Sequence, residues 1–356
     1  MYNTLQLRNF RGFKEISLEL KPITLIAGKN NTGKSSILDS IFLFQDYADP
    51  LVFLKLVGFR GMRQVDISAR AIWGPLFHNI DTSEPIEFKL NDKYSLLLQR
   101  SKEYVSVGNA LDILDGKISN SSNSYALSCE YKGENKHFSG DYLISYENSS
   151  RNILLRSHDN MPLQPNEAFV QYLGPHVTLS DIEVAELFGQ IELSKNAFEK
   201  KKLLEILAML DDDIVDITTI ANNGLVQLYF TNKENIKLPV HVIGDGMMKL
   251  LHIALVLLAK PGSILLLDEV ENGLHYTMYT KLWKSIATLA VQEKCQIIAT
   301  THSYECINGA FEGVQAAGIE DSFAYIRLDK NENGIIPKTY TFDALGRSLD
   351  TDWEVR

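Results

Sequence analysis

What is scarce in this chain of 356 residues excludes several classes of protein. It has only three cysteines, Cys129, Cys295 and Cys306, at unrelated spacings. They predict neither a disulfide framework nor a zinc site, and they suit a reducing cytosol. A secretion signal is lacking too, because the opening MYNTLQLRNF has no charged segment followed by an apolar one. We therefore expect a soluble, cytoplasmic protein.

Long apolar runs and an excess of basic charge are also lacking. The longest apolar run, residues 250–267, is interrupted by the sequence KPG, so it predicts a helix, a turn and a strand and no membrane span. The formal net charge of −10 argues against a protein that coats nucleic acid through general basicity. Two local basic groups remain, one formed by Arg8, Arg11 and Lys14 and one by residues 200–202. For the lysine run, a solvated helix surface is the commoner meaning.

Hydrophobic periodicity divides the chain into helices and strands. Alternation over residues 5–20 predicts a β-hairpin, and ITLIAG followed by SSILDSIFLF predicts a strand, a loop and a helix. Residues 81–157 favour an antiparallel β insertion with the strands PIEFKL, YSLLLQR, YVSVG, YALSCEY and DYLISYE and the loop ISNSSNS. Helical patterning over residues 179–210 is too short for a coiled-coil arm. Further strands, SILLLDE, CQIIAT and FAYIRL, and a final hairpin DKNENGIIPKTYTF follow.

The strongest motif is GKNNTGKSS, residues 28–36, which matches G-x-x-x-x-G-K-[ST] between a predicted strand and a predicted helix. In such a loop backbone N–H groups surround phosphate oxygens, Lys34 reaches the β and γ phosphates, and the Ser35 hydroxyl can ligate Mg²⁺. We expect the nucleotide to be bound by Gly28, Asn30, Asn31, Thr32, Gly33, Lys34, Ser35 and Ser36.

Two later segments supply the acid that a P-loop NTPase needs and a histidine that could assist it. In SILLLDEVENGLH the run before Asp268 is apolar without alternation, as in a strand covered on both faces. Asp268 would hold the metal, and Glu269 would polarise the attacking water, although it could be only a strand-end carboxylate. In QIIATTHS, His302 stands where it could contact the γ-phosphate or align the water with Glu269. Taken alone, such a histidine would be structural.

A glycine step precedes the helical pattern that begins near residue 247. Gly244, Asp245 and Gly246 in HVIGDGMMKLL supply a tight turn and exposed N–H groups, which is already a sufficient account of a helix start. The same N–H groups can bind an anion.

The order of these motifs resembles the ABC-type ATPases of the SMC and RecF branch, and LRNFRGF resembles its N-terminal strand pair. Within that branch, NNTGKSS and DEVENGLH are most similar to OLD-type ATPases and their anti-phage relatives in Septu, PARIS and retron systems. The resemblance covers residues 1–50 and 165–328. It implies an α/β P-loop NTPase of the ABC and SMC-head type, with a mixed central sheet, an antiparallel β insertion, a short helical insert and no long coiled coil.

Within that fold we expect an N-terminal ATPase lobe at residues 1–80 and a β insertion of the same head at residues 81–165. A compact helical and strand insert would follow at residues 166–235, and a C-terminal ATPase lobe at residues 236–356. The resemblance also implies ATP and Mg²⁺ as cofactors.

In that family two heads dimerise face to face, and each ATP lies between the P-loop of one head and the glycine signature of the other. The resemblance therefore places the step at residues 244–246 against the opposite γ-phosphate. It places Asn272 and Gly273, in ENGLH, in a loop that crosses the interface. Arg8 or Arg11 would lie near the nucleotide. The candidates for a water-coordinating glutamine are Gln45 and Gln64.

OLD nucleases carry a metal-dependent Toprim domain after the ATPase, and this chain has no room for one. Only 54 residues follow His302 (356 − 302). Asp350 and Asp352 imitate the Asp-x-Asp pair of that domain, but they stand in a polar tail. We therefore expect an effector activity to reside in a separately encoded protein.

The leading hypothesis is an ATP-switched homodimer that acts as the sensor or regulatory subunit of a multi-protein, anti-phage complex and hydrolyses ATP slowly. One alternative is an ATP-stabilised scaffold that cages a toxic effector. Another is a RecF-like repair ATPase that binds double-stranded DNA, a partner that the acidic pI disfavours. No membrane partner is expected.

Overall fold

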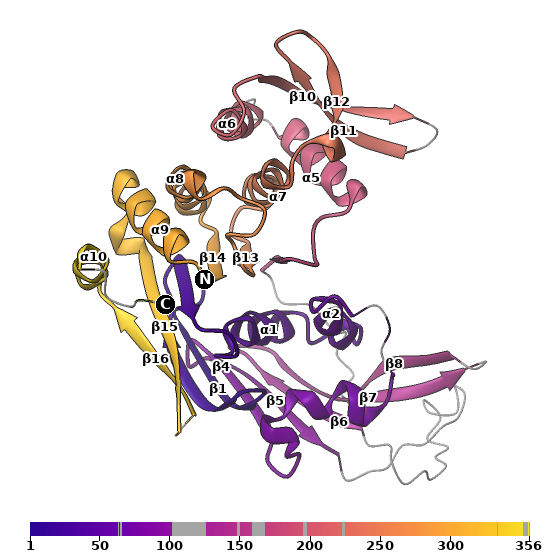
Figure 1. Cartoon of the computed structure of the whole chain (residues 1–356). Coiled ribbons are helices and arrows are strands. Elements are labelled where there is room, and N and C mark those ends of the chain that lie inside the picture. Colours follow the sequence, from indigo (N-terminus) through magenta and orange to yellow (C-terminus); the bar gives the residue numbers. More distant parts are fainter. Residues whose placement is uncertain are drawn as a thin grey trace.

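The computed structural model describes residues 1–62, 64, 66–101, 126–147, 150–158, 168–194, 198–222, 225–332, 334–351 and 355. The expected strand YVSVG, the loop ISNSSNS and Asp352 lie outside these residues. The described chain forms three sheets with helices between and around them (Figure 1). None of the helices in this part of the chain is long and apolar enough to cross a membrane.

The central sheet is mixed and carries the motifs. Its order is β16-β15-β3-β14-β13-β9, with β16 antiparallel and the other strands parallel to one another. The bounds are β3 (Ile23–Gly28), β9 (Val170–Leu173), β13 (Ile264–Leu267), β14 (Gln296–Thr301), β15 (Phe323–Asn331) and β16 (Gly334–Tyr340). Because the carboxyl ends of parallel strands share one edge, the residues after β3, β13 and β14 meet there.

Alternate residues of the central strands enter two different cores. Leu265 and Leu267 pack with helices on one face, whereas Ile264 and Leu266 pack with α1 and a second sheet on the other. The first face is covered by α7 (Asp245–Ala259), α8 (Tyr279–Gln292), α9 (Tyr304–Ala317) and α10 (Phe342–Asp350). The second contacts α1 (Lys34–Gln45) and α2 (Val52–Gly58). Burial on both faces explains the unbroken apolar runs in the sequence.

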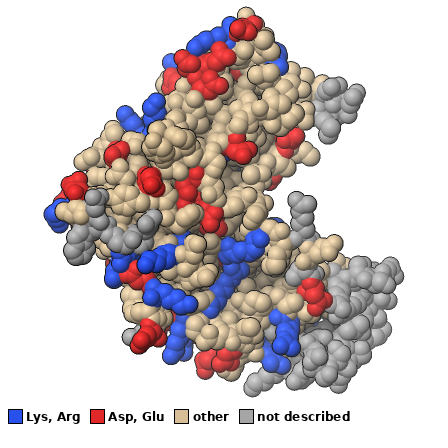
Figure 2. All heavy atoms as spheres, viewed as in Figure 1, with Lys and Arg blue, Asp and Glu red and all other residues tan. Residues whose placement is uncertain are grey.

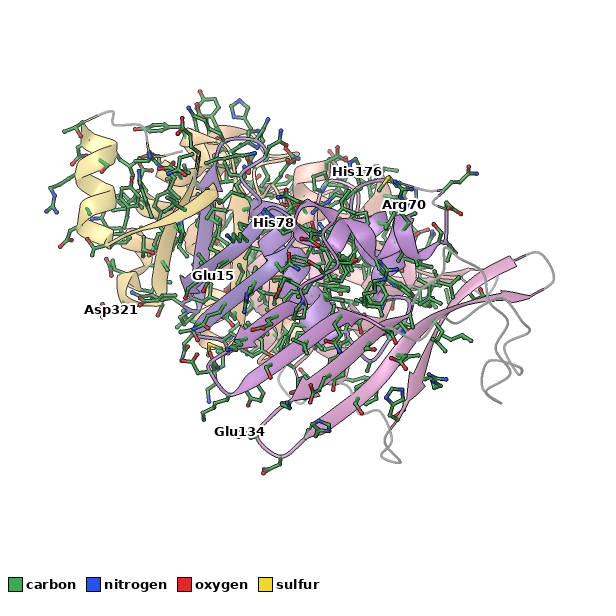
Figure 3. All side chains as sticks on the ribbon, turned by 90° about the horizontal axis from the view of Figure 1, so that it is seen from below. Glu15, Arg70, His78, Glu134, His176 and Asp321 are labelled. Atoms are coloured by element: carbon green, nitrogen blue, oxygen red, sulfur yellow. The ribbon has the colours of Figure 1, made fainter. Side chains whose placement is uncertain are left out.

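The second sheet is antiparallel, in the order β2-β1-β4-β5-β6-β7-β8. Its strands are β1 (Thr4–Phe10), β2 (Phe13–Glu19), β4 (Ile86–Leu90), β5 (Tyr94–Arg100), β6 (Leu127–Lys132), β7 (His137–Glu147) and β8 (Ser150–Ser157). Leu7 pairs with Ile16 on one side and with Phe88 on the other, so the expected hairpin and the expected β insertion are one continuous sheet. Figure 3 shows this sheet from below, with Glu134 at the turn between β6 and β7. The short helix α3 (Ala69–Ile72) lies in the segment that joins α2 to β4.

A third unit lies between β9 and α7 in the chain. It comprises α5 (Asp181–Leu193), α6 (Phe198–Leu207) and a three-stranded sheet of β10 (Ile214–Asn222), β11 (Leu225–Asn232) and β12 (Lys237–Pro239). Ser180 and Glu183 cap α5 reciprocally, which sets its start. Both helices are short, so the described residues contain no long coiled coil, as expected.

Candidate functional site

The loop between β3 and α1 forms the bed of the candidate site. Asn31 and Gly33 have φ values of 63° and 85°, a left-handed region that glycine and asparagine adopt most readily. The Lys34 ammonium donates to the backbone oxygens of Gly28 at 2.7 Å and Lys29 at 3.0 Å, so it is held across the loop. Burial lowers the pKa of Lys34, and the carboxylates beyond the loop oppose that shift.

Asp268, which follows β13, is the centre of a hydrogen-bond network. Its Oδ1 accepts from Ser35 Oγ at 2.9 Å and from Thr300 Oγ1 at 2.6 Å, and its Oδ2 accepts from Tyr172 OH at 2.8 Å. The structure thus brings together residues from β3–α1, β13, β14 and β9, all at one sheet edge.

The donor set of this network suits magnesium. Mg²⁺ prefers carboxylate and hydroxyl oxygens, keeps several waters, and is usually completed by substrate phosphates. Ser35 and Asp268 supply such oxygens side by side. Among the described residues there is no group of three or more His, Cys, Asp or Glu side chains that could hold a metal ion.

Glu269 follows Asp268 in a left-handed conformation, with φ 49°. Its backbone N–H donates to Thr300 Oγ1 at 2.9 Å, and its side chain accepts from Asn272 Nδ2 at 2.6 Å. Lys249 of α7 donates to the backbone oxygens of Glu269 and Asn272 at 2.9 and 3.1 Å. This lysine ties the helix after the glycine step to the turn that presents Glu269.

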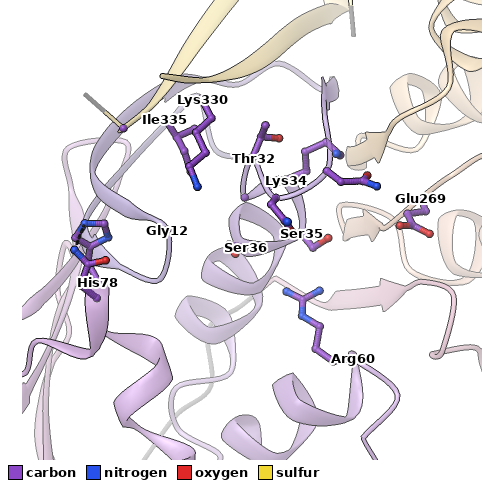
Figure 4. A pocket seen from close by; sticks show the side chains of 15 residues that line it. Gly12, Thr32, Lys34, Ser35, Ser36, Arg60, His78, Glu269, Lys330 and Ile335 are labelled. Atoms are coloured by element: carbon purple, nitrogen blue, oxygen red, sulfur yellow. Dashed lines mark hydrogen bonds between the residues drawn. The ribbon is translucent and has the colours of Figure 1, made fainter. Parts of the chain in front are cut away.

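A cavity of about 810 Å³ opens over the P-loop (Figure 4). Its lining includes every P-loop residue from Asn30 to Ser36, together with Arg60, Glu269, Gly12, His78, Asn79, Lys330, Gly334 and Ile335. In Figure 2 basic side chains gather at the middle of the molecule, next to acidic side chains above them. The cavity therefore offers cations and N–H donors beside carboxylates, as a bound polyphosphate and its metal require.

Arg60 is a cavity residue that the sequence analysis missed. Its guanidinium pairs with the fully buried Asp39 and lies 3.7 Å from Asp268 Oδ2. The ring of the preceding residue, Phe59, stacks on Tyr172 with centroids 3.9 Å apart and planes 12° apart, which holds the end of α2 against β9. The geometry brings a second cation to the end of the cavity that contains Glu269.

One signal could have indicated this arginine. Asp39 stands one turn after Ser35 on α1, within an otherwise apolar stretch, and buried carboxylates require cationic or hydrogen-bonding partners. Arg11 and Arg60 supply them. Burial raises the pKa of the Asp39 carboxyl above its usual value, and both guanidinium groups oppose that shift.

The other basic and amide candidates lie outside the cavity lining. Arg8 pairs with Glu87 at 3.6 Å across the antiparallel sheet. Arg11 is occupied with Asp39, although its neighbour Gly12 lines the cavity. Gln45 is buried and hydrogen-bonds to Tyr2, and Gln64 is exposed.

The lysine run does not form a free basic patch. Each lysine of residues 200–202 forms an ion pair with an acid. Lys200 lies 3.0 Å from Asp216, Lys201 lies 3.5 Å from Glu205, and Lys202 lies 2.9 Å from Glu293. These pairs neutralise the run, in line with the solvated-surface interpretation.

His302 lies beside a third acid and not beside Glu269. Its Nδ1 is 2.9 Å from Oε1 of Glu271, and the same oxygen accepts its backbone N–H at 2.8 Å. The Glu271 side chain is 7 % exposed, whereas that of His302 is 47 % exposed. The histidine is therefore anchored at one edge and open to solvent at the other.

The glycine step forms the start of α7. Gly244 is the N-cap residue and no side chain caps the helix, so its first N–H groups lack a side-chain acceptor. A Cβ at Gly246 would lie 2.8 Å from the carbonyl oxygen of Gly273 and 3.0 Å from Leu274, so this position requires glycine within its own head. A Cβ at Gly244 would meet nothing within 4 Å. Gly273 thus packs beside the glycine step within the same head.

The family comparison decides the class of this site. The model described as "AAA domain, putative AbiEii toxin, Type IV TA system" matches residues 114–308, which is more than half of the chain. The chain belongs to this family of AAA ATPase domains. A model described as "AAA ATPase domain" matches residues 1–169 of the same ATPase.

Relatives of this ATPase agree with the class. A Helicobacter pylori protein named "ATP/GTP phosphatase" is 24 % identical over 96 % of this chain and 95 % of its own length. Two solved Smc head structures each have a TM-score of 0.51. One is an Smc head bound to the C-winged helix domain of ScpA. It is 15 % identical, and the match covers 97 % of this chain and 99 % of that chain. The other, bound to the C-terminal domain of ScpA derived from Pyrococcus furiosus, is 12 % identical and covers 99 % of both chains. The ATPase therefore has the SMC-head fold.

Proposed function

We propose that this chain binds magnesium-ATP in the cavity and hydrolyses it to ADP and phosphate. Lys34 would contact the β and γ phosphates, Ser35 and Asp268 would hold the metal, and Glu269 would polarise the attacking water. Mg²⁺ supplies neutralisation of phosphate charge when it is bound. The observation that carries this proposal is the direct Ser35–Asp268 contact above the P-loop, with Glu269 lining the same cavity.

The roles of the side chains follow from their surroundings. Asn272 and the Thr300 hydroxyl hold Glu269 in its turn, which limits the positions of its carboxylate. Phosphoryl transfer to water depends mainly on positioning and on stabilising developing charge. Arg60, anchored by Asp39, brings a positive charge to the same end of the cavity, where it can stabilise that developing negative charge. His302, fixed by Glu271, would sense the γ-phosphate from the edge.

We further propose that ATP joins two heads. The start of α7 is exposed and carries no side-chain cap, so its N–H groups can donate to an anion from outside the head. The γ-phosphate bound to a second copy would supply that anion, with residues 244–246 and 272–273 forming the contact.

Glu269→Gln tests both steps. This substitution keeps the size and the Asn272 contact of the side chain but removes the base, so ATP and Mg²⁺ should trap a dimer that turns over at background rate. Light scattering after size exclusion gives the mass, and phosphate release gives the rate. Lys34→Ala is the matched control, because it should remain monomeric at the same nucleotide concentration.

If the Glu269→Gln chain stays monomeric with saturating ATP and Mg²⁺, the dimer proposal is wrong. The proposal of hydrolysis is then tested by the rate of the wild-type chain alone. If wild-type turnover is itself at background although ATP binds, the scaffold that cages an effector becomes the better account.

For the cellular role, we propose a regulatory subunit that acts on a separately encoded effector in anti-phage defence. Supporting this are the OLD-type motifs and the Smc heads described in complex with ScpA domains. Purification from the native host should recover a partner with wild type and lose it with Lys34→Ala. Salt-sensitive retention of double-stranded DNA, without a protein partner, would instead favour the RecF-like alternative.

A further inference from the structure

The lining of the cavity extends beyond the P-loop residues themselves. Arg60 and Glu269 lie on one side of the P-loop, and Gly12, His78 and Ile335 lie on the other (Figure 4). If the phosphates lie along the loop with the γ-phosphate toward Glu269, the nucleoside is directed toward His78. This end of the cavity is built by three segments: the β1–β2 turn, residues 74–80 and the β15–β16 hairpin.

The segment at residues 74–80 is clamped to the β1–β2 turn. The backbone N–H of Arg11 donates to the Leu76 oxygen at 2.7 Å, and Phe10 forms an isolated bridge with Phe77. His78 Nδ1 lies 2.9 Å from the backbone oxygen of Arg11. These contacts fix the position of the next side chain, Asn79, relative to the P-loop.

The contacts of His78 determine its tautomer. A carbonyl oxygen only accepts, so in the neutral imidazole Nδ1 carries the hydrogen and Nε2 is the lone-pair acceptor. Asn79 Nδ2 lies 3.2 Å from that Nε2 and therefore donates to it. The amide of Asn79 is thus oriented by His78, with Oδ1 and the second N–H left for another partner.

The backbone here is held in an uncommon conformation. Asn79 and Ile80 have φ values of 53° and 61°, and the left-handed region is especially costly for a β-branched residue such as Ile80. Such conformations persist where surrounding contacts impose them, and they cluster at ligand sites. Here they present the Asn79 amide at the cavity.

An adjacent acceptor and donor on one amide match the edge of adenine. Adenine offers its N6–H donor beside the N7 acceptor, whereas guanine offers two acceptors, O6 and N7, to the same amide. Among the described residues that line this end, no carboxylate is available to accept the N1–H and N2–H groups of guanine. The Ile335 side chain, whose Cδ1 would be 3.2 Å from a Cβ at Gly12, adds an apolar surface for the face of a base.

We propose that Asn79, oriented by His78, reads the nucleobase and makes this site select adenine over guanine nucleotides. This inference rests on the proposed binding of nucleotide at the P-loop. One good bidentate contact gives discrimination of about tenfold or more in affinity.

The test compares the binding of ATP, GTP and inorganic tripolyphosphate, each with Mg²⁺, in the Glu269→Gln background. ATP should bind about tenfold more tightly than GTP. Asn79→Ala and Asn79→Gly should both lower ATP affinity to the level of GTP and leave tripolyphosphate unchanged. Glycine accepts the left-handed backbone, so this pair separates the amide from backbone strain. His78→Ala should weaken ATP selectivity in part, because the Asn79 amide loses its orientation.

Equal affinity for ATP and GTP in the parent chain would overturn the inference while the proposed function stands. Loss of selectivity in Asn79→Ala but not in Asn79→Gly would overturn it too, because the amide would then be irrelevant. If none of the three ligands binds the parent chain, the proposed function itself fails, and this inference fails with it.

Discussion

The two halves of the proposed two-headed site differ in how complete they are within one chain. The P-loop half-site, consisting of Lys34, Ser35, Arg60 and Asp268, is tied together by side-chain hydrogen bonds and ion pairs. The signature half-site, residues 244–246, is largely exposed, and the helix it starts has no side-chain cap. The first half-site is organised before any ligand arrives, whereas the second leaves N–H donors for a ligand from outside.

The largest effect is expected from breaking the complete half-site at Lys34. Lys34→Ala removes the ammonium that spans the P-loop, so ATP affinity should fall about hundredfold, given the strength of a charge-assisted contact. Hydrolysis should fall to background. Isothermal titration with ATP and Mg²⁺ measures the affinity. Lys29→Ala is the control, because Lys29 is exposed on the same loop and should bind ATP normally. Equal losses in both variants would contradict a specific role for Lys34.

The incomplete half-site is best tested at Gly244. Its Cβ position is open and its φ is −58°, so Gly244→Arg should fold and bind ATP as wild type does. It should nevertheless stay monomeric, and its hydrolysis should fall about hundredfold, as when an oxyanion donor is lost. Light scattering and phosphate release measure the two effects, with Gly244→Ala as the matched control.

Gly246→Arg is a weaker test of contact between heads. Its side chain would push against Gly273 and Leu274 of the same chain, so a defect would mix local damage with lost dimerisation. A Gly244→Arg chain that dimerises and hydrolyses ATP normally would show that the signature half-site has no partner.

A third experiment asks whether Arg60 belongs to the chemistry or only balances Asp39. Arg60→Ala should slow hydrolysis about ten- to hundredfold, because a cation near the transferred phosphate is lost. It should also lower the free energy of unfolding by about 1–3 kcal/mol, because Asp39 keeps only Arg11. Adding Asp39→Asn should recover much of the stability and none of the rate. Recovery of both would make Arg60 a purely structural residue.

Residues in the motifs of the half-sites could be predicted from the sequence, whereas residues around them could not. Asp268 and Glu269 could be located because a short contiguous motif on a buried strand determines both their identity and their place. Arg60 could not, since its place depends on Asp39, 21 positions away, and on the stacking of Phe59 against β9. The continuity of β1 with β4 was equally hidden, because alternation predicts strands and not their partners.

The smallest effect concerns the helix that carries the signature half-site. His252 of α7 is buried, and burial lowers the pKa of its imidazole to about 4, although Asp181 and Glu183 oppose this. Below the ordinary value of 6.5 the unfolded chain binds a proton that the folded chain does not. Stability is therefore lost as the pH falls from 6.5 toward 4, by about 2 kcal/mol between pH 7 and pH 5.

His252→Leu removes this proton uptake and the buried Nε2, which has no hydrogen-bond partner among the described residues. Urea unfolding at pH 7 and pH 5 should show a loss for this variant that is about 2 kcal/mol smaller than the loss for wild type. An equal loss in wild type and His252→Leu would show that protonation of His252 does not cause the loss of stability in acid.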